Sequence, residues 1–205
     1  MIKKDELDEE DLKNLHTEVN VTSNVDHPNI VRMMEAFESA GAYFIVFELM
    51  VGGELFDRIV ETDCYTEEEA CKVFKPVVDA IRYCHSNGIV HRDLKPENLL
   101  YLGENDDSTI KISDFGLARV LDSKSQLMST VCGTPAYLAP EIIRNEKYGP
   151  SCDIWSLGII LYVLLCGYPP FGDEANEEMY MKIKNGELTF ASPEWDNISD
   201  EGTNP

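Results

Sequence analysis

The sequence lacks several patterns that would each define a class of protein. None of its six cysteines stands in a C-x-x-C pair, so neither a zinc site nor a dithiol redox motif is indicated. The longest apolar stretch, residues 154–168, is interrupted by Ser156 and is too short to span a bilayer. The first residues are acidic and carry no apolar core of a signal peptide. We therefore expect a reduced, cytoplasmic protein.

Basic side chains are also scarce. The chain has 17 Lys and Arg against 38 Asp and Glu, which gives a net charge of −21 over 205 residues. Such a surface argues against binding nucleic acid or an anionic membrane, and it suits protein partners that carry basic residues. For most of these carboxylates, keeping the protein in solution is a sufficient explanation. With 43% hydrophobic residues, the chain can still bury a core.

Hydrophobic periodicity predicts helices and strands in a mixed order. Apolar residues at helical spacing, with caps and stop signals, predict helices over residues 5–24, 54–60, 66–86, 151–166 and 176–185. The helix that begins at Thr66 carries a capping-box pattern with Glu69. Two apolar runs, residues 30–37 and 42–50, predict a β-hairpin. Residues 89–116 predict short strands and turns, and residues 117–150 look irregular.

Two loops in the middle of the chain concentrate chemically active side chains. Residues 91–98, H-R-D-L-K-P-E-N, place two acidic, two basic and one amide side chain in a proline-broken loop. A predicted strand over residues 109–113 then ends in Asp114-Phe115-Gly116. Asn98 and Asp114 can therefore meet at the ends of neighbouring strands. Amide and carboxylate oxygens of this kind bind hard cations such as Mg²⁺, together with phosphates.

These motifs, in this order, resemble the catalytic domain of eukaryotic serine/threonine protein kinases. Residues 91–98 match H-R-D-L-x-x-x-N, residues 114–116 match D-F-G, and residues 139–141 match A-P-E. The resemblance covers nearly the whole chain and implies an α+β, protein-kinase-like fold of two lobes. Residues 1–50 would form a partial N-lobe with helix C, two strands and the hinge. Residues 51–205 would form a mostly helical C-lobe that lacks its last helices.

The resemblance implies transfer of the γ-phosphate of ATP to Ser or Thr hydroxyls, with ATP and Mg²⁺ as cofactors. Asp93 would accept the proton of the substrate hydroxyl, and Lys95 would contact the transferred phosphate. Asn98 and Asp114 would hold Mg²⁺. Thr134 would tie the substrate-binding loop to Asp93 and Lys95.

Further positions follow from the same resemblance for the nucleotide. Glu18 matches the glutamate of helix C that pairs with a lysine on the third strand of such kinases. The hinge would lie at Glu48 and Met50, whose backbone would bind adenine. Leu100 matches the apolar floor beneath the base.

Substrate and regulatory positions can be matched as well. The segments G-G-E-L-F-D-R-I-V at 52–60 and G-Y-P-P-F at 167–171 look most like the calcium/calmodulin-dependent kinase group. This likeness implies substrates with an arginine three residues before the phosphorylated residue, bound by Glu54 and Glu97; Glu54 could instead face ribose. Arg92 resembles the arginine that receives an activation-loop phosphate, and Thr130 is the matching acceptor.

Without the resemblance, these residues have plainer explanations. The polar residues of the two central loops are also typical turn formers. The glutamates assigned to nucleotide and substrate are equally typical of a solvated acidic surface. For Thr130, the simpler alternative is that its loop is not phosphorylated.

The sequence also departs from the family pattern. No G-x-G-x-x-G loop precedes the predicted helix over residues 5–24, and the V-A-I-K lysine is absent. The arginine that would pair with Glu141 is missing with the last helices. We expect the two remaining N-lobe strands to form an isolated hairpin with exposed edges. Losing a preorganised charge contact to the phosphates predicts a poor enzyme in this form.

Two hypotheses remain open. In the first, the sequence is part of an active kinase, as the intact catalytic loop indicates. In the second, it is a catalytically impaired truncated kinase that acts as a binding or decoy protein. No EF-hand loop and no evident calmodulin-binding helix lie within these residues. Calcium or calmodulin control is therefore expected only through sequence outside them.

Overall fold

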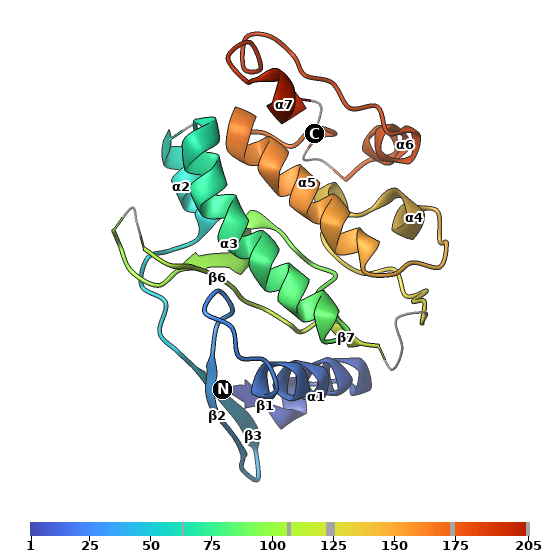
Figure 1. Cartoon of the computed structure of the whole chain (residues 1–205). Coiled ribbons are helices and arrows are strands. Elements are labelled where there is room, and N and C mark those ends of the chain that lie inside the picture. Colours follow the sequence, from blue (N-terminus) through green and yellow to red (C-terminus); the bar gives the residue numbers. More distant parts are fainter. Residues whose placement is uncertain (63, 106–107, 122–125, 173–174, 204–205) are drawn as a thin grey trace.

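The chain folds into two parts of unequal size, which lie one above the other in Figure 1. A computed structural model describes residues 1–62, 64–105, 108–121, 126–172 and 175–203. The smaller part holds a small sheet and one long helix, and the larger part is mostly helical. This arrangement confirms the predicted α+β fold with a partial first lobe.

The sheet of the smaller part has three antiparallel strands. Its order is β1-β3-β2, with β1 at Ile2–Lys3, β2 at Met33–Glu38 and β3 at Ala42–Phe47. The expectation of an isolated hairpin was wrong, because β1 pairs with the outer edge of β3, where Ile2 lies opposite Tyr43. A strand of two residues is too short to show alternation in a sequence, and the tertiary pairing defines it.

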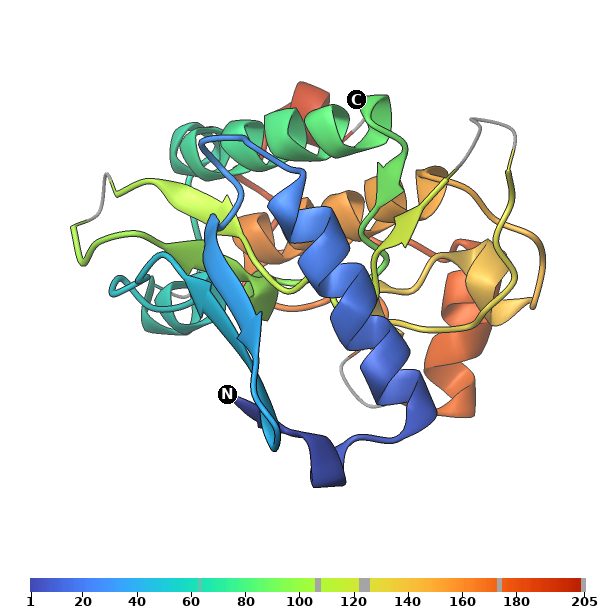
Figure 2. The same cartoon turned by 90° about the horizontal axis from the view of Figure 1, so that it is seen from below.

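Helix α1 (Glu9–Ser23) begins four residues later than the sequence predicts. The Asp8 side chain caps it by accepting the Glu10 and Asp11 N–H groups at 2.8 Å each. This cap satisfies free N–H groups in the first turn of the helix. The helix therefore begins directly after Asp8, and the residues before Asp8 lie outside it. Leu15 packs into the core. In Figure 2, α1 lies between the sheet and the segment that carries β7.

The larger part is built around two buried helices that contact each other, α3 (Glu67–Ser86) and α5 (Ser151–Cys166). The predicted capping box of α3 is present, since Thr66 and Glu69 each accept the other's backbone N–H. Helix α5 has the predicted bounds and ends at Gly167, whose φ of 85° is a conformation that glycine adopts readily. Figure 1 shows both helices running through the centre of this part.

Short elements connect these helices and carry the polar loops. Those between α3 and α5 are β4 (Ile89–Val90), the 3₁₀ helix Pro96–Asn98, β5 (Leu99–Tyr101), β6 (Ile110–Ile112), β7 (Arg119–Val120), the 3₁₀ helix Pro135–Tyr137 and α4 (Pro140–Ile143). Strand β5 pairs with β6, and β4 pairs with β7. The remaining elements are the 3₁₀ helix Lys4–Glu6, α2 (Leu55–Thr62), α6 (Glu177–Asn185) and α7 (Asp200–Thr203).

The chain between α1 and β2 joins the two parts directly. The Val31 N–H donates to the Ile112 carbonyl at 2.8 Å, and the Ile112 N–H donates to the Asn29 carbonyl at 2.9 Å. The Asn29 side chain also donates to the Ile110 carbonyl at 2.8 Å. This segment therefore runs beside β6 as a parallel partner and fixes the smaller part against the larger one.

All six cysteines are free thiols. Burial raises the pKa of the Cys84 thiol to about 12, so this side chain behaves as a small core hydrophobe. Over the described ranges, the structure contains no helix with the length and apolar character needed to cross a membrane.

Candidate active site

A cavity of about 350 Å³ lies where the two parts meet. Its walls come from α1, the end of β3 and the residues after it, β5, and the loop that follows β6. The lining residues are Glu18, Thr22, Val31, Phe47, Glu48, Met50, Leu100, Ser113, Asp114 and Phe115. The fold thus brings together five predicted site residues that are far apart in sequence: Glu18, Glu48, Met50, Leu100 and Asp114.

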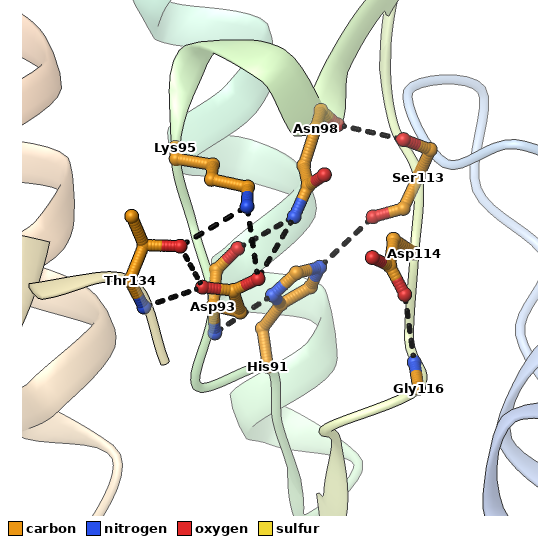
Figure 3. Close-up of polar contacts among 8 residues, drawn as sticks. All are labelled: His91, Asp93, Lys95, Asn98, Ser113, Asp114, Gly116 and Thr134. Atoms are coloured by element: carbon orange, nitrogen blue, oxygen red, sulfur yellow. Dashed lines mark hydrogen bonds and ion pairs between the residues drawn. The ribbon is translucent and has the colours of Figure 1, made fainter. Parts of the chain in front are cut away.

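The carboxylate of Asp93 is held on both sides (Figure 3). Its Oδ1 atom accepts two bonds from Thr134, from the backbone N–H at 2.8 Å and from the hydroxyl at 2.7 Å. Its Oδ2 atom lies 3.4 Å from Asn98 Nδ2 and 3.5 Å from Lys95 Nζ. Lys95 also donates to the Thr134 hydroxyl at 3.0 Å. The structure therefore assembles these four predicted residues into one hydrogen-bonded group.

His91 connects this group to the strand that precedes Asp114. Its Nδ1 accepts the Asp93 N–H at 3.3 Å, which leaves the proton on Nε2 to donate to the Ser113 carbonyl at 3.1 Å. The Ser113 N–H and hydroxyl donate to the Asn98 carbonyl at 2.9 and 3.0 Å. These bonds hold the loop of residues 91–98 and the end of β6 in fixed positions relative to each other.

Asp153 of α5 supports the same loop from beneath. Fully buried, it accepts the backbone N–H groups of His91 at 2.9 Å and Arg92 at 2.8 Å, and it lies 2.7 Å from His85 Nε2. Arg92 has a φ of 72°, a conformation that non-glycine residues adopt only at a cost. The bond from its N–H to Asp153 holds Arg92 in this conformation.

Asn98 and Asp114 present oxygens that suit a hard cation. The amide nitrogen of Asn98 bonds to the Asp93 carbonyl at 2.8 Å, which turns its oxygen toward the side of Asp114 (Figure 3). One Asp114 oxygen accepts the Gly116 N–H at 3.1 Å, and the other points toward the catalytic loop. These donors fit Mg²⁺, which takes a few protein oxygens and completes its shell with water and phosphate.

The electrostatics of the cavity are acidic. Burial raises the pKa of Glu18 above its ordinary value, and the negative charge of Asp114 raises it further. The described residues that line the cavity include Glu18, Glu48 and Asp114 but no lysine or arginine. A bound cation between Glu18 and Asp114 would relieve this repulsion.

One residue of the site, Lys111 on β6, was missed by the sequence reasoning. Its ammonium lies 2.6 and 2.8 Å from the two Glu48 carboxylate oxygens. No local signal marked it, because a lysine between two isoleucines is the ordinary alternation of a strand with one exposed face. The structure instead buries all three residues of β6, and a buried charge needs a partner. The Glu48 N–H donates to the Arg32 carbonyl at 2.9 Å, so the Glu48 carbonyl is the backbone group left for a ligand.

Arg92 and Thr130 are linked through Tyr148, a second residue that the sequence reasoning missed. The Tyr148 hydroxyl donates to the Thr130 carbonyl at 2.6 Å and lies 3.4 Å from Arg92 Nη1. Burial raises the pKa of Tyr148 to about 12, so its hydroxyl remains a donor at neutral pH. Thr130 itself is exposed.

Glu54 and Glu97 lie outside the cavity. Glu54 lines a separate polar hollow of about 640 Å³, together with Asp57. The Oε2 atom of Glu97 is buried and has no hydrogen-bond partner among the residues that the structure describes. The negative charge of Glu97 helps burial to raise the pKa of Tyr137. A buried carboxylate oxygen without a donor among these residues is unusual.

The two-part fold, the cleft and the arrangement around Asp93 together define a protein kinase domain. The chain belongs to the protein kinase domain family, whose sequence profile matches residues 1–204.

Similar proteins show which group of protein kinases the chain resembles. The chain is 50% identical over 186 residues to calcium/calmodulin-dependent protein kinase type 1 of Macrobrachium nipponense, covering 91% of this chain and 53% of that protein. It is also 50% identical over 190 residues to calcium/calmodulin-dependent protein kinase type IV of Homo sapiens, covering 92% of this chain and 40% of that protein. The predicted resemblance to this serine/threonine kinase group is confirmed. The chain spans about half the length of the curated relatives it matches, or less.

Proposed function

We propose that this protein transfers the γ-phosphate of ATP to serine or threonine hydroxyls of other proteins. The observation that carries the proposal is the group around Asp93, where Thr134, Lys95 and Asn98 fix one carboxylate beside the predicted metal-binding oxygens. Phosphoryl transfer depends on positioning and on charge neutralisation more than on covalent chemistry by the enzyme. This group can supply both.

The two oxygens of Asp93 have different roles in this proposal. Oδ1 already accepts two short bonds from Thr134, whereas Oδ2 has only the longer contacts with Asn98 and Lys95. Oδ2 is therefore the atom that accepts the proton of the substrate hydroxyl. Lys95 lies beside it and places a positive charge where the transferred phosphoryl group carries negative charge.

ATP and Mg²⁺ are the cofactors that this function requires. Asn98 and Asp114 would hold Mg²⁺, which when bound neutralises phosphate charge. The adenine ring would lie over Leu100 and bond to the Glu48 carbonyl and the Met50 backbone. Glu18 faces Asp114 across the same cavity.

The substrate preference that we infer is an arginine three residues before the phosphorylated hydroxyl. The hollow at Glu54 supports it, because the described lining holds five carboxylates against two basic side chains, Arg58 and Lys72. The net charge of −21 supports it as well. Phosphorylation of Thr130 would add charge close to Arg92 and order the segment that holds Thr130.

Calcium and calmodulin control, which the names of the relatives suggest, would act through sequence outside these 205 residues. We expect this activity in the cytoplasm.

The test is phosphate transfer to a peptide with arginine at the −3 position, alongside binding of Mg-ATP by calorimetry. We expect Asp93→Asn to lower kcat by about a hundredfold or more while Mg-ATP still binds. Asp114→Asn should weaken Mg-ATP binding, and Glu97→Gln should reduce the preference over a −3 alanine peptide. Asp79→Asn, on the outer face of α3, is the matched control.

A failure of the unmodified chain to bind Mg-ATP would contradict the proposal. The acidic side chains of the cavity, Glu18 and Asp114, would then favour the alternative, a binding or decoy protein. Retained binding of the basic peptide by such a chain would identify that role.

A further inference from the structure

We propose that Lys111 is a positioning residue that fixes the hinge for nucleotide binding by holding the Glu48 carboxylate. The role in nucleotide binding rests on the proposed function of the cleft, while the positioning of the hinge stands on the contacts themselves. Lys111 lies on β6 of the larger part, and Glu48 directly follows β3 of the smaller part. The pair therefore connects the two parts of the fold, and both segments continue into the lining of the cleft, at Glu48 and at Ser113.

The Glu48 carboxylate is satisfied from two sides. Its Oε1 accepts both the Lys111 ammonium at 2.6 Å and the Arg32 N–H at 2.7 Å, and its Oε2 accepts Lys111 at 2.8 Å. The Glu48 N–H in turn donates to the Arg32 carbonyl at 2.9 Å. The side chain and the backbone of Glu48 are thus fixed to the same neighbour. This leaves the orientation of the Glu48 carbonyl, the proposed adenine acceptor, with little freedom.

The pair is mostly buried, which bears on what it contributes. The side chains of Lys111 and Glu48 are only 11% and 20% exposed. Desolvating two charges costs about as much as their attraction returns, so a buried ion pair is weak evidence for stabilisation. The best-attested role of such groups is to select one arrangement over its alternatives. Here the selected arrangement is that of the hinge relative to β6.

The Lys111–Glu48 contact also relates the hinge to Asp114, because Lys111 lies close to Asp114 in the sequence. Three residues after Lys111 the same segment reaches Asp114, and Ile112 of β6 bonds to the chain just before Arg32. The contact therefore sets the distance between the adenine-binding backbone and the predicted metal-binding carboxylate. A nucleotide that spans both ends needs this distance fixed before it binds.

The first experiment measures amide hydrogen exchange in the whole chain without ligand. We expect Lys111→Met to speed exchange at the Arg32 and Glu48 amides by about tenfold or more, because both lose their fixed acceptor geometry. Lys111→Arg should stay close to the unmodified rate. Lys182→Met, which removes the exposed Lys182–Glu178 pair, is the matched control and should change neither amide. Unchanged exchange in a folded Lys111→Met chain would overturn the proposal.

The second experiment separates the two ends of the nucleotide. We expect Lys111→Met to weaken adenosine binding by about tenfold, since one hinge hydrogen bond is misplaced. Binding of Mg-tripolyphosphate, which needs only Asn98 and Asp114, should stay within about twofold. A merely destabilising substitution would weaken both ligands or neither, and Lys111→Arg should restore adenosine. Equal adenosine affinity in the unmodified chain and in Lys111→Met would contradict the role of Lys111 in nucleotide binding.

Two outcomes need separate treatment. If Lys111→Met fails to fold, the double variant Lys111→Met/Glu48→Met removes the unpaired buried charge, and it should fold with the same loss of adenosine binding. If the unmodified chain does not bind adenosine, the proposed function of the cleft fails. The exchange experiment then decides the positioning role of Lys111 by itself.

Discussion

Thr134 determines which oxygen of Asp93 is free of short hydrogen bonds, because its hydroxyl and N–H both bind Oδ1. Thr134→Ala removes the hydroxyl and leaves the N–H, so the carboxylate can rotate. We expect kcat for peptide phosphorylation to fall by about tenfold to a hundredfold, with KM for ATP little changed. Thr134→Ser should recover most of the rate in the same steady-state assay. An alanine variant as fast as the unmodified chain would show that Asp93 is oriented by other contacts.

Glu18 makes stability depend on pH in a direction opposite to that of most acids. Its pKa is raised in the folded chain, so between the ordinary value near 4.5 and the raised value the folded state keeps a proton that the unfolded state loses. Its contribution to stability is therefore present below pH 4.5 and is lost as the pH rises through the folded pKa.

Glu18→Gln should remove this loss. We expect the variant to have a higher free energy of unfolding than the unmodified chain at pH 7.5, and a smaller advantage at pH 5.5. Urea unfolding at the two pH values measures both. Glu10→Gln, an exposed acid at the start of the same helix, is the control. An advantage that stays constant with pH would mean that the Glu18 charge is not the cause.

At the scale of elements, α5 has a second task besides filling the core, because its Asp153 holds the catalytic loop. Asp153→Ala leaves two buried backbone N–H groups without an acceptor and leaves His85 without its partner. We expect the free energy of unfolding to fall by about 3 kcal/mol or more.

The matched control for that substitution is Asp79→Ala, which removes an exposed ion pair with Arg82 on α3. It should change stability by no more than about 0.5 kcal/mol. Chemical denaturation of both variants provides the comparison. Equal effects of the two substitutions would show that the loop does not depend on α5.

The elements also show what a sequence can predict. The bounds of α5 and the cap of α3 were predictable, because long apolar stripes and capping pairs are local signals. Strand β7 was not, since its two residues carry no periodicity and it exists only through tertiary pairing. The late start of α1 was not predictable either, because it depends on which of several neighbouring acids provides the cap.

The residues of the site also divide into those that a sequence can predict and those that it cannot. Asp93, Asn98 and Asp114 could be named because their motifs lie on short stretches of sequence with a known family likeness. Lys111 and Tyr148 could not, because their partners lie 63 and 18 residues away, and no local pattern signals such contacts. Predicting them requires the paired strands and the packed loops themselves.

At the scale of the whole molecule, the charge imbalance exceeds what ion pairs can neutralise. The chain has 38 acidic and 17 basic side chains, so at least 21 acids lack a basic partner of their own. Several of the ion pairs that form are exposed ones within single helices, such as Lys72–Glu68 and Lys182–Glu178. Each of these contributes little to stability. Repulsion among the remaining acids therefore opposes the compact state.

Salt should relieve this repulsion. Raising NaCl from 20 to 300 mM shortens the screening length from about 20 Å to about 6 Å, which is less than the spacing of most surface charges. We expect Tm to rise by about 3–6 °C, equivalent to about 1–2 kcal/mol for a chain of this size. The rise should level off above about 0.3 M if it comes from screening, whereas a general effect of salt on hydration would continue in proportion to concentration. A Tm that falls or stays constant in a calorimetric salt series would show that the acids are locally compensated.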